Sequence, residues 1–224
     1  MAKKDKKVES IALDEQLTKS EAFIEKNLKS ILIAIAAVIV VVAGIFIYRN
    51  HMANVELEAQ NAIAKNQTAF AQDQFEQALN GDGANDLGFL KVIDKYSGTK
   101  TANLAKLYAA ICYANTDKVA EAIKMFEDFD AKDDQMVSPA ALAALGNCYV
   151  KNGDSQKGAE TLVKAAQKAD NDAISPLALR QAGEIYESLN QPEKALELYQ
   201  QIKDKYFRSP LAGEIDKYIE RVSK

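Results

Sequence analysis

The hydrophobic residues of this chain follow two patterns, an unbroken apolar run near the N-terminus and then helical spacing toward the C-terminus. The run covers residues 31–48 and contains no charged residue. A helix rises about 1.5 Å per residue, so the run spans roughly 27 Å, close to the ~30 Å hydrocarbon core of a bilayer. Lys29 and Arg49 bound it, and Tyr48 stands where interfacial aromatic residues are common. The pattern predicts a transmembrane helix over 31–48; the alternative, a buried core helix, would normally keep a polar face.

The charges that flank this helix predict its orientation. Seven lysines precede it, whereas the 20 residues after it hold only Arg49 and Lys65. The positive-inside rule therefore places the N-terminus in the cytoplasm and residues 49–224 on the other side of the membrane. No small-residue cleavage motif follows the helix, so we expect a retained single-pass anchor and not a cleaved signal peptide.

Two interpretations of the N-terminal tail, residues 1–30, stay open. Leu13, Leu17, Ile24 and Leu28 recur at helical spacing. They predict a short amphipathic helix that lies on the membrane or contacts a membrane partner. The other interpretation is a simple extension of the transmembrane helix.

Beyond the anchor, a long helix is predicted over 53–79, and the turn-forming residues 80–83 end it. After it the sequence repeats, because Ser-Pro pairs at Ser138 and Ser175 lie 37 residues apart and open the same pattern. In each repeat a small residue is followed three positions later by tyrosine, and a second helix offers a small residue and then a large one. These sets are Ala110, Tyr113, Ala122 and Phe126, then Gly146, Tyr149, Gly158 and Leu162, then Gly183, Tyr186, Ala195 and Tyr199.

A small residue at the same point of each helix lets the neighbouring helix cross closely, and the aromatic residue fills the next gap. One helix pair cannot bury its apolar face alone, so the pairs must stack. We therefore predict an all-α fold, with an α-solenoid of about three to four helix pairs after the transmembrane helix. A generic helical bundle is the alternative. The predicted boundaries are a partial repeat over 86–102, repeats over 103–138, 139–175 and 176–209, and a capping helix over 210–222.

Composition and charge narrow the function. The net charge is −4 in total and −5 over residues 49–224, which argues against nucleic acid as a partner. The chain has one histidine, His51, at the membrane exit, and no glycine loop of the phosphate-binding kind. We therefore predict no catalytic, cofactor-binding or metal-binding residue and no small-molecule substrate. Cys112 and Cys148 occupy equivalent places in adjacent repeats, about 8–10 Å apart, so we expect two buried free thiols.

The repeats resemble the tetratricopeptide repeat. Its signature is matched by Leu179, Ala182, Gly183, Tyr186, Ala195 and Tyr199, and nearly as well by the set from Leu142 to Leu162. The layout also resembles the YfgM-like family of bacterial inner-membrane proteins, which carry a short cytoplasmic tail, one anchor and a periplasmic repeat domain. This resemblance implies an inner-membrane location and protein partners such as the Sec translocon or periplasmic folding factors.

In tetratricopeptide domains the first helices of the pairs line a concave groove. Of the positions that grip a carboxylate in some relatives, only Asn147 carries the matching residue type, so we expect no carboxylate clamp. The predicted partner-binding groove is apolar at one end and charged at the other, which suits an apolar or helical segment of a partner. Its residues are Leu107, Tyr108, Ile111, Asn147, Lys151, Arg180, Glu184 and Glu187. The alternative is that these side chains pack under the preceding long helix.

Two functions remain. The first is a membrane-tethered adaptor that holds protein partners near the translocon or in an envelope complex, and the second is a chaperone-like holdase for unfolded exported chains. One stable co-purifying complex would favour the adaptor, and suppression of aggregation of unrelated proteins would favour the holdase.

Overall fold

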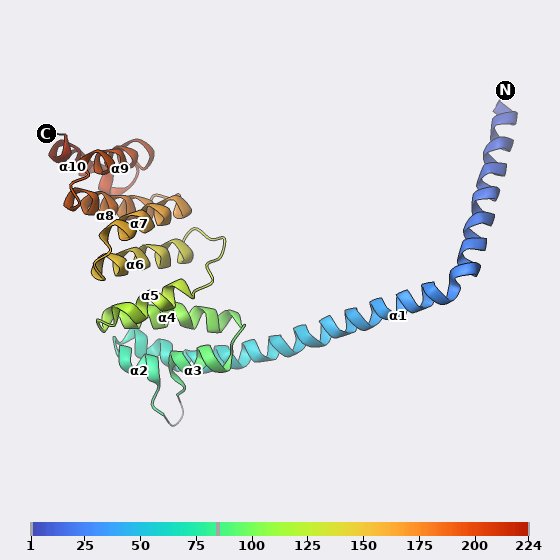
Figure 1. Ribbon diagram of the computed structural model, residues 1–224, viewed down its shortest axis with the longest axis horizontal. Coiled ribbons are helices and arrows are strands. Elements are labelled where there is room, and N and C mark those ends of the chain that lie inside the picture. The colour runs from blue at the N-terminus through green and yellow to red at the C-terminus, as the bar shows by residue number, and fades with distance from the viewer. Residues whose placement is uncertain (1, 84–85, 224) are drawn as a thin grey trace. The chain divides into compact units, whose positions relative to one another are not determined.

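The computed structural model describes the backbone of residues 2–83 and 86–223 and, within these ranges, the side chains from residue 23 onward (Figure 1). All regular elements in the described ranges are helices. The chain divides into two compact units, Met1–Asn54 and Val55–Lys224.

The first unit belongs to the long helix α1 (Ala2–Ala71). From Phe23 onward, α1 is the one helix in the described part of the chain that is long and apolar enough to cross a membrane. Its aliphatic and aromatic side chains are open to the surroundings; Val40 is 71% exposed and Phe46 is 72% exposed. A surface of this kind is stable only against an apolar medium or partner. The side chains of Leu13 and Leu17, from the predicted amphipathic helix of the tail, lie outside those that the structure describes.

The second unit corrects one predicted boundary, because the expected helix over 53–79 is broken. Helix α1 ends at Ala71, and a separate helix α2 (Phe75–Asn80) follows. Asp73 between them has a left-handed φ of 57°. The Gln74 N–H donates to the Ala69 carbonyl at 2.9 Å, and the Asp73 N–H donates to the Phe70 carbonyl at 3.1 Å. This pair of bonds is the Schellman arrangement, which satisfies the last carbonyls of a helix and turns the chain back.

Helix α3 (Gly88–Lys95) follows α2 after a loop that is pinched at its base. A Cβ atom at Gly81 would lie 2.1 Å from the Asp86 carbonyl oxygen, and one at Gly88 would lie 2.4 Å from the Leu79 carbonyl oxygen. Only glycines allow the two ends of the loop to approach this closely, and both have positive φ. The α2 and α3 helices therefore occupy the place of one second helix that a loop interrupts.

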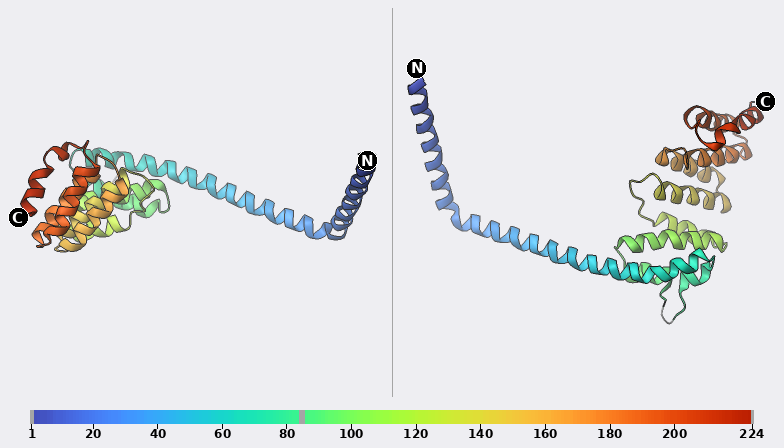
Figure 2. Two further views of the ribbon diagram at one scale, coloured as in Figure 1. Left: turned by 90° about the horizontal axis from the view of Figure 1, so that it is seen from above. Right: turned by 180° about the vertical axis from the view of Figure 1, so that it is seen from behind.

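The later elements form three helix pairs and an end helix, and they stack in chain order (Figures 1 and 2). In sequence they are α4 (Lys100–Asn115) with α5 (Val119–Glu127), α6 (Val137–Lys151) with α7 (Ser155–Ala169), α8 (Ser175–Ser188) with α9 (Pro192–Lys205), the 3₁₀ turn η1 (Pro210–Gly213), and α10 (Ile215–Val222). The all-α fold with stacked helix pairs is the one that the sequence predicts.

The turns inside the pairs repeat one geometry. Asp117, Gly153 and Asn190 have positive φ, as Asp73 does, and these four residues are separated by 44, 36 and 37 positions. In each of the three later turns the following N–H donates to the carbonyl of the repeat tyrosine, Tyr113, Tyr149 or Tyr186, at 2.9–3.0 Å. The longer first interval reflects the loop between α2 and α3. The segment from α1 to α3 thus has the turn geometry of the later pairs.

Close helix crossings explain the small residues of the repeat. A Cβ atom at Gly183 would lie 2.4 Å from the Tyr199 ring, and one at Gly158 would lie 2.4 Å from Val150 Cγ2. The predicted role of these glycines is therefore confirmed. Cys112 and Cys148 are free and buried, and burial raises the pKa of the Cys112 thiol to about 12.

Candidate partner-binding groove

An apolar hollow of about 380 Å³ lies between α4 and α6. None of the residues that line it is charged; they are Leu107, Ile111, Phe126, Met136, Val137, Ala140, Ala141 and Ala144. Met136 and Val137 stand at its mouth with 57% and 49% of their surfaces exposed, so two adjacent large side chains add exposed apolar surface to the hollow.

A second hollow of about 280 Å³ continues the first, because both are lined by Ile111, Phe126 and Ala144. It adds the polar residues Asn115, Asn147 and Lys151. The two hollows together are called the α4–α6 groove below. The groove is apolar along most of its length and ends in two amides and one ammonium group.

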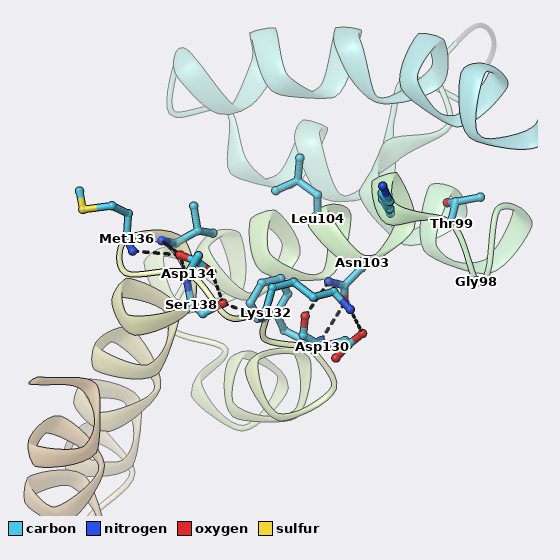
Figure 3. Close-up of a pocket in the computed structure, with 12 residues that line it drawn as sticks. Gly98, Thr99, Asn103, Leu104, Asp130, Lys132, Asp134, Met136 and Ser138 are labelled. Carbon is cyan, nitrogen blue, oxygen red and sulfur yellow. Dashed lines mark hydrogen bonds and ion pairs between the residues drawn. The ribbon is translucent and has the colours of Figure 1, made fainter. Parts of the chain in front are cut away.

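A larger hollow of about 730 Å³ adjoins the groove at Met136 and Val137 (Figure 3). Hydrogen bonds between α4 and the loop after α5 hold its walls together. The Asp130 N–H donates to Asn103 Oδ1 at 2.8 Å, and Asn103 Nδ2 donates to the Asp130 carbonyl at 3.0 Å. Figure 3 shows this pair facing one another beside Lys132.

The groove is open because the elements around it are short or small. Helix α5 has nine residues, whereas the equivalent α7 has 15. The α6 wall consists of Ala140, Ala141 and Ala144 at the groove. In the repeat register, Ala140 corresponds to Leu104 in α4 and to Leu177 in α8, so α6 carries the smallest residue of the three. Short α5 and small α6 side chains leave unfilled space between the two pairs.

The charged groups near the groove are already satisfied within the chain. Lys151 pairs with Asp117 at 2.5 Å, Lys132 pairs with Asp130, and Lys106 donates to the Asp128 carbonyl at 2.9 Å. Lys151 and Lys132 are each balanced by a carboxylate, so these two exposed pairs add no net charge beside the groove.

Asp134 holds the start of α6 by hydrogen bonds. Its carboxylate accepts from the Ser138 hydroxyl at 2.5 Å and from the backbone N–H groups of Met136 and Val137 at 2.9 and 2.6 Å. The Ser138 hydroxyl bond, followed by the backbone bonds, lowers the pKa of Asp134 to about 2. Asp134 therefore positions the exposed Met136–Val137 edge, and it is not free to bind a ligand.

The structure brings together four of the eight predicted site residues. Leu107, Ile111, Asn147 and Lys151 all line the α4–α6 groove. Tyr108 lies elsewhere. Its ring stacks on Phe89 with 5.1 Å between the centroids, so it belongs to the core shared by α1, α3 and α4. For Tyr108 the alternative of packing under the preceding helix is the correct one.

The three charged residues of α8 do not line the α4–α6 groove. Arg180 pairs with Glu184 at 2.6 Å. Glu187 accepts from the Tyr199 hydroxyl at 2.5 Å and from Arg221 at 2.6 and 2.8 Å, which ties α8 to α9 and α10. Glu187 therefore stabilises the end of the domain.

Sequence reasoning missed the α6 edge of the groove. Met136 and Val137 are two adjacent large apolar residues between a polar loop and the Ser-Pro pair that opens a helix. That pair was the available signal. The sequence did not indicate that Ala140 and Ala144 line the groove, since alanine is common on both buried and exposed helix faces.

The described residues contain no cluster of histidine, cysteine or carboxylate groups suited to a metal ion. The groove offers apolar surface with Asn115, Asn147 and Lys151 at one end. Such a surface binds side chains and backbone amides, and it holds no nucleophile paired with a general base.

The sequence profile of the tetratricopeptide repeat-like domain matches residues 21–205. No curated protein matches the chain by sequence. Two crystal structures of the kinesin light chain nearly identical TPR-like repeats of Podosopora anserina, one of them a variant, are similar in fold. Each has a TM-score of 0.56 and 15% identity over 75% of this chain, and the match covers 85% and 86% of the two chains.

Proposed function

This chain belongs to the tetratricopeptide repeat-like domain family, and from that membership we propose that it is a membrane-tethered adaptor that binds a partner protein in the α4–α6 groove. The repeat fold is a scaffold for protein–protein interaction. The observation that carries the proposal is the main hollow of this groove, which no charged residue lines and whose Met136 and Val137 edge is exposed. Exposed apolar surface that is rimmed by polar residues is typical of interaction sites.

The proposed tether is the apolar part of α1. Its uncovered side chains over 31–48 support insertion into a bilayer, and the lysine excess before them supports a cytoplasmic N-terminus. In this proposal the location is a bacterial inner membrane with the repeat domain in the periplasm. The Sec translocon and periplasmic folding factors are the proposed partners, on the strength of the YfgM-like layout.

A protease experiment tests the tether and its orientation. Protease added outside spheroplasts should digest residues 49–224 and leave a small membrane-embedded fragment that contains the N-terminus. Extraction of the intact chain from membranes by alkaline carbonate, without detergent, would contradict the anchor. Digestion that requires spheroplast lysis would contradict the orientation.

Crosslinking in intact cells tests the adaptor. A photoreactive benzoylphenylalanine at Val137, on the groove edge, should capture one membrane complex reproducibly. The same residue at Ala120, which is exposed on α5 outside the groove lining, is the matched control. If no position across the repeat domain captures a specific protein, the chain is not an adaptor.

The holdase remains the second candidate, because the apolar main hollow of the groove would accept many apolar sequences. A holdase would suppress the aggregation of unrelated unfolded proteins at equimolar ratio. An adaptor would not do so, and it would yield the same partner from cells in every preparation.

A further inference from the structure

The chemistry of the α4–α6 groove specifies its occupant more closely than the family does. Every side chain that lines the main hollow is uncharged and apolar, and Leu107, Ile111 and Phe126 form its inner wall. A charged side chain placed there would lose its hydration without gaining a partner. The nearby Lys151 and Lys132 are already paired with carboxylates.

The polar end of the groove fits a peptide backbone. The Asn147 side chain is exposed, lines the second hollow, and makes no hydrogen bond to another described residue. The Asn115 side chain donates one of its two N–H groups to the Ile111 carbonyl at 2.8 Å, which leaves the other N–H and the oxygen available. Two amides that can each donate and accept match the N–H and C=O groups of a polypeptide better than a hydrocarbon chain.

We propose that the α4–α6 groove binds an uncharged segment of another protein, with aliphatic side chains in the hollow lined by Leu107, Ile111 and Ala140 and backbone groups against Asn147. This inference rests on the proposed function and names the chemistry of its partner. From Leu107 to Asn115 the α4 side of the groove runs roughly 12 Å, which accommodates about four extended residues, whose backbone groups are free to bond to Asn147.

The test uses the full-length chain in phospholipid nanodiscs and a defined probe. The probe is an N-acetylated, C-amidated peptide of about six residues, long enough to cross the groove in an extended conformation and too short to form a stable helix. It is composed of leucine, alanine and glutamine and carries one photo-leucine. Two counterparts replace its leucines by lysine or by glutamate. The expected result is photo-crosslinking of the uncharged peptide to residues that line the groove, at least about tenfold above either charged peptide.

Two matched variants locate the site. Ala140→Asp puts a charge at the groove mouth, and Ala120→Asp puts the same charge near the start of α5; both alanines are exposed, so both variants should fold. Ala140→Asp should lower crosslinking about tenfold, and Ala120→Asp should leave it unchanged. Asn147→Ala should lower it without altering the melting temperature, because this side chain bonds to nothing within the described chain.

Several outcomes would overturn the inference. These are equal crosslinking of the charged peptides, crosslinks that map outside the groove, and crosslinking that survives Ala140→Asp. Displacement of the peptide by a photoreactive phospholipid that labels the groove would show a lipid site instead. If in-cell capture yields a partner while the peptide fails, only this inference is wrong; if no partner is captured from any position, the proposed function itself fails.

Discussion

Among single residues, the glycines at helix crossings should be sensitive even to the addition of one methyl group. Gly183→Ala would place a methyl group 2.4 Å from Tyr199, a residue with no exposed surface whose hydroxyl is held by Glu187. The ring cannot move aside without breaking that bond. We expect the free energy of unfolding to fall by about 1–3 kcal/mol, as is usual for overpacking. Urea unfolding followed by circular dichroism measures the change.

The control is Gly213→Ala, because a Cβ atom at Gly213 meets no other atom within 4 Å. Its effect should stay within ~0.5 kcal/mol, the range of ordinary surface substitutions. Equal effects of the two substitutions would mean that the α8–α9 crossing is not tightly packed.

Asp134 gives the start of α6 a predictable pH dependence. Its pKa is about 2 in the folded chain, below the ordinary value of 3.8, because Ser138 and the backbone N–H groups bond to the carboxylate. A depressed pKa contributes stability that is fully present above pH ~4 and is lost as the pH falls toward 2. Hydrogen exchange of the first turn of α6 should therefore quicken over this window. In Asp134→Asn the quickening should be absent; its persistence would assign it to other carboxylates.

The packing role of the repeat glycines could be predicted from the sequence, whereas the side of α4 on which Tyr108 lies could not. Gly146 and Gly183 lie 37 residues apart, Gly158 falls in register with Ala122 and Ala195, and a close helix crossing explains a small residue at each of these positions. Consecutive helical residues lie about 100° apart, so Leu107 and Tyr108 cannot both face one narrow groove. The choice between them depends on Phe89, which stacks on Tyr108 from a different helix.

At the scale of the elements, substitutions in the turns inside the helix pairs should change stability in opposite directions at glycine and at aspartate. Gly153 and Asp117 occupy the same left-handed position in successive pairs, and a Cβ atom at Gly153 meets no other atom within 4 Å. Gly153→Ala should therefore cost about 1 kcal/mol from backbone strain alone, and Asp117→Gly should relieve a similar strain.

Urea midpoints of the two variants check this prediction. Asp117 also pairs with the exposed Lys151, so Lys151→Ala measures the small contribution of that pair separately. The assignment is wrong if Gly153→Ala is neutral.

The break in the helix predicted over 53–79 could not be read from local sequence. Gln72, Asp73 and Gln74 contain neither glycine nor proline; glutamine is a good helix former, and a single aspartate is tolerated inside a helix. The left-handed φ of Asp73 is accepted because the turn brings Phe75 against Phe70, with 5.8 Å between their ring centroids. That tertiary contact lies beyond any local propensity. The interval from Asp73 to Asp117 reveals the interrupted repeat only once the turns are known.

At the scale of the whole repeat domain, the junction between α5 and α6 determines where a binding groove forms. Hollows lie on two sides of this junction, and Phe126 lines three of them. The sequence predicted stacked pairs, but a groove between two pairs depends on the length of α5 and the size of the α6 alanines together. The repeat pattern does not contain these two quantities. It therefore indicated α4 and α6 correctly, placed α8 in the site wrongly, and gave half of the site residues.

The same junction should also divide the stability of the domain. The buried core separates into a cluster at α1–α4, one at α7–α10, and a middle cluster in which Phe126 joins α4 and α5 to Leu145 and Tyr149 of α6. Repeat domains gain stability from interfaces between neighbours, so weakening one interface should uncouple the two sides. Phe126→Ala removes a side chain that is 5% exposed and should cost about 3–5 kcal/mol.

Hydrogen exchange with mass spectrometry distinguishes uncoupling from general loss of stability. In Phe126→Ala, protection should fall in α4 and α5, while α8–α10 keep the wild-type rates. Phe89→Ala, which removes a fully buried ring from the α1–α4 cluster, is the control and should leave the α6–α7 interface protected. A uniform fall in protection from α4 to α10 in Phe126→Ala would mean that the domain unfolds as one unit. The α4–α6 groove would then lie within one cooperative unit and not at an interface between two units that a bound partner could stabilise.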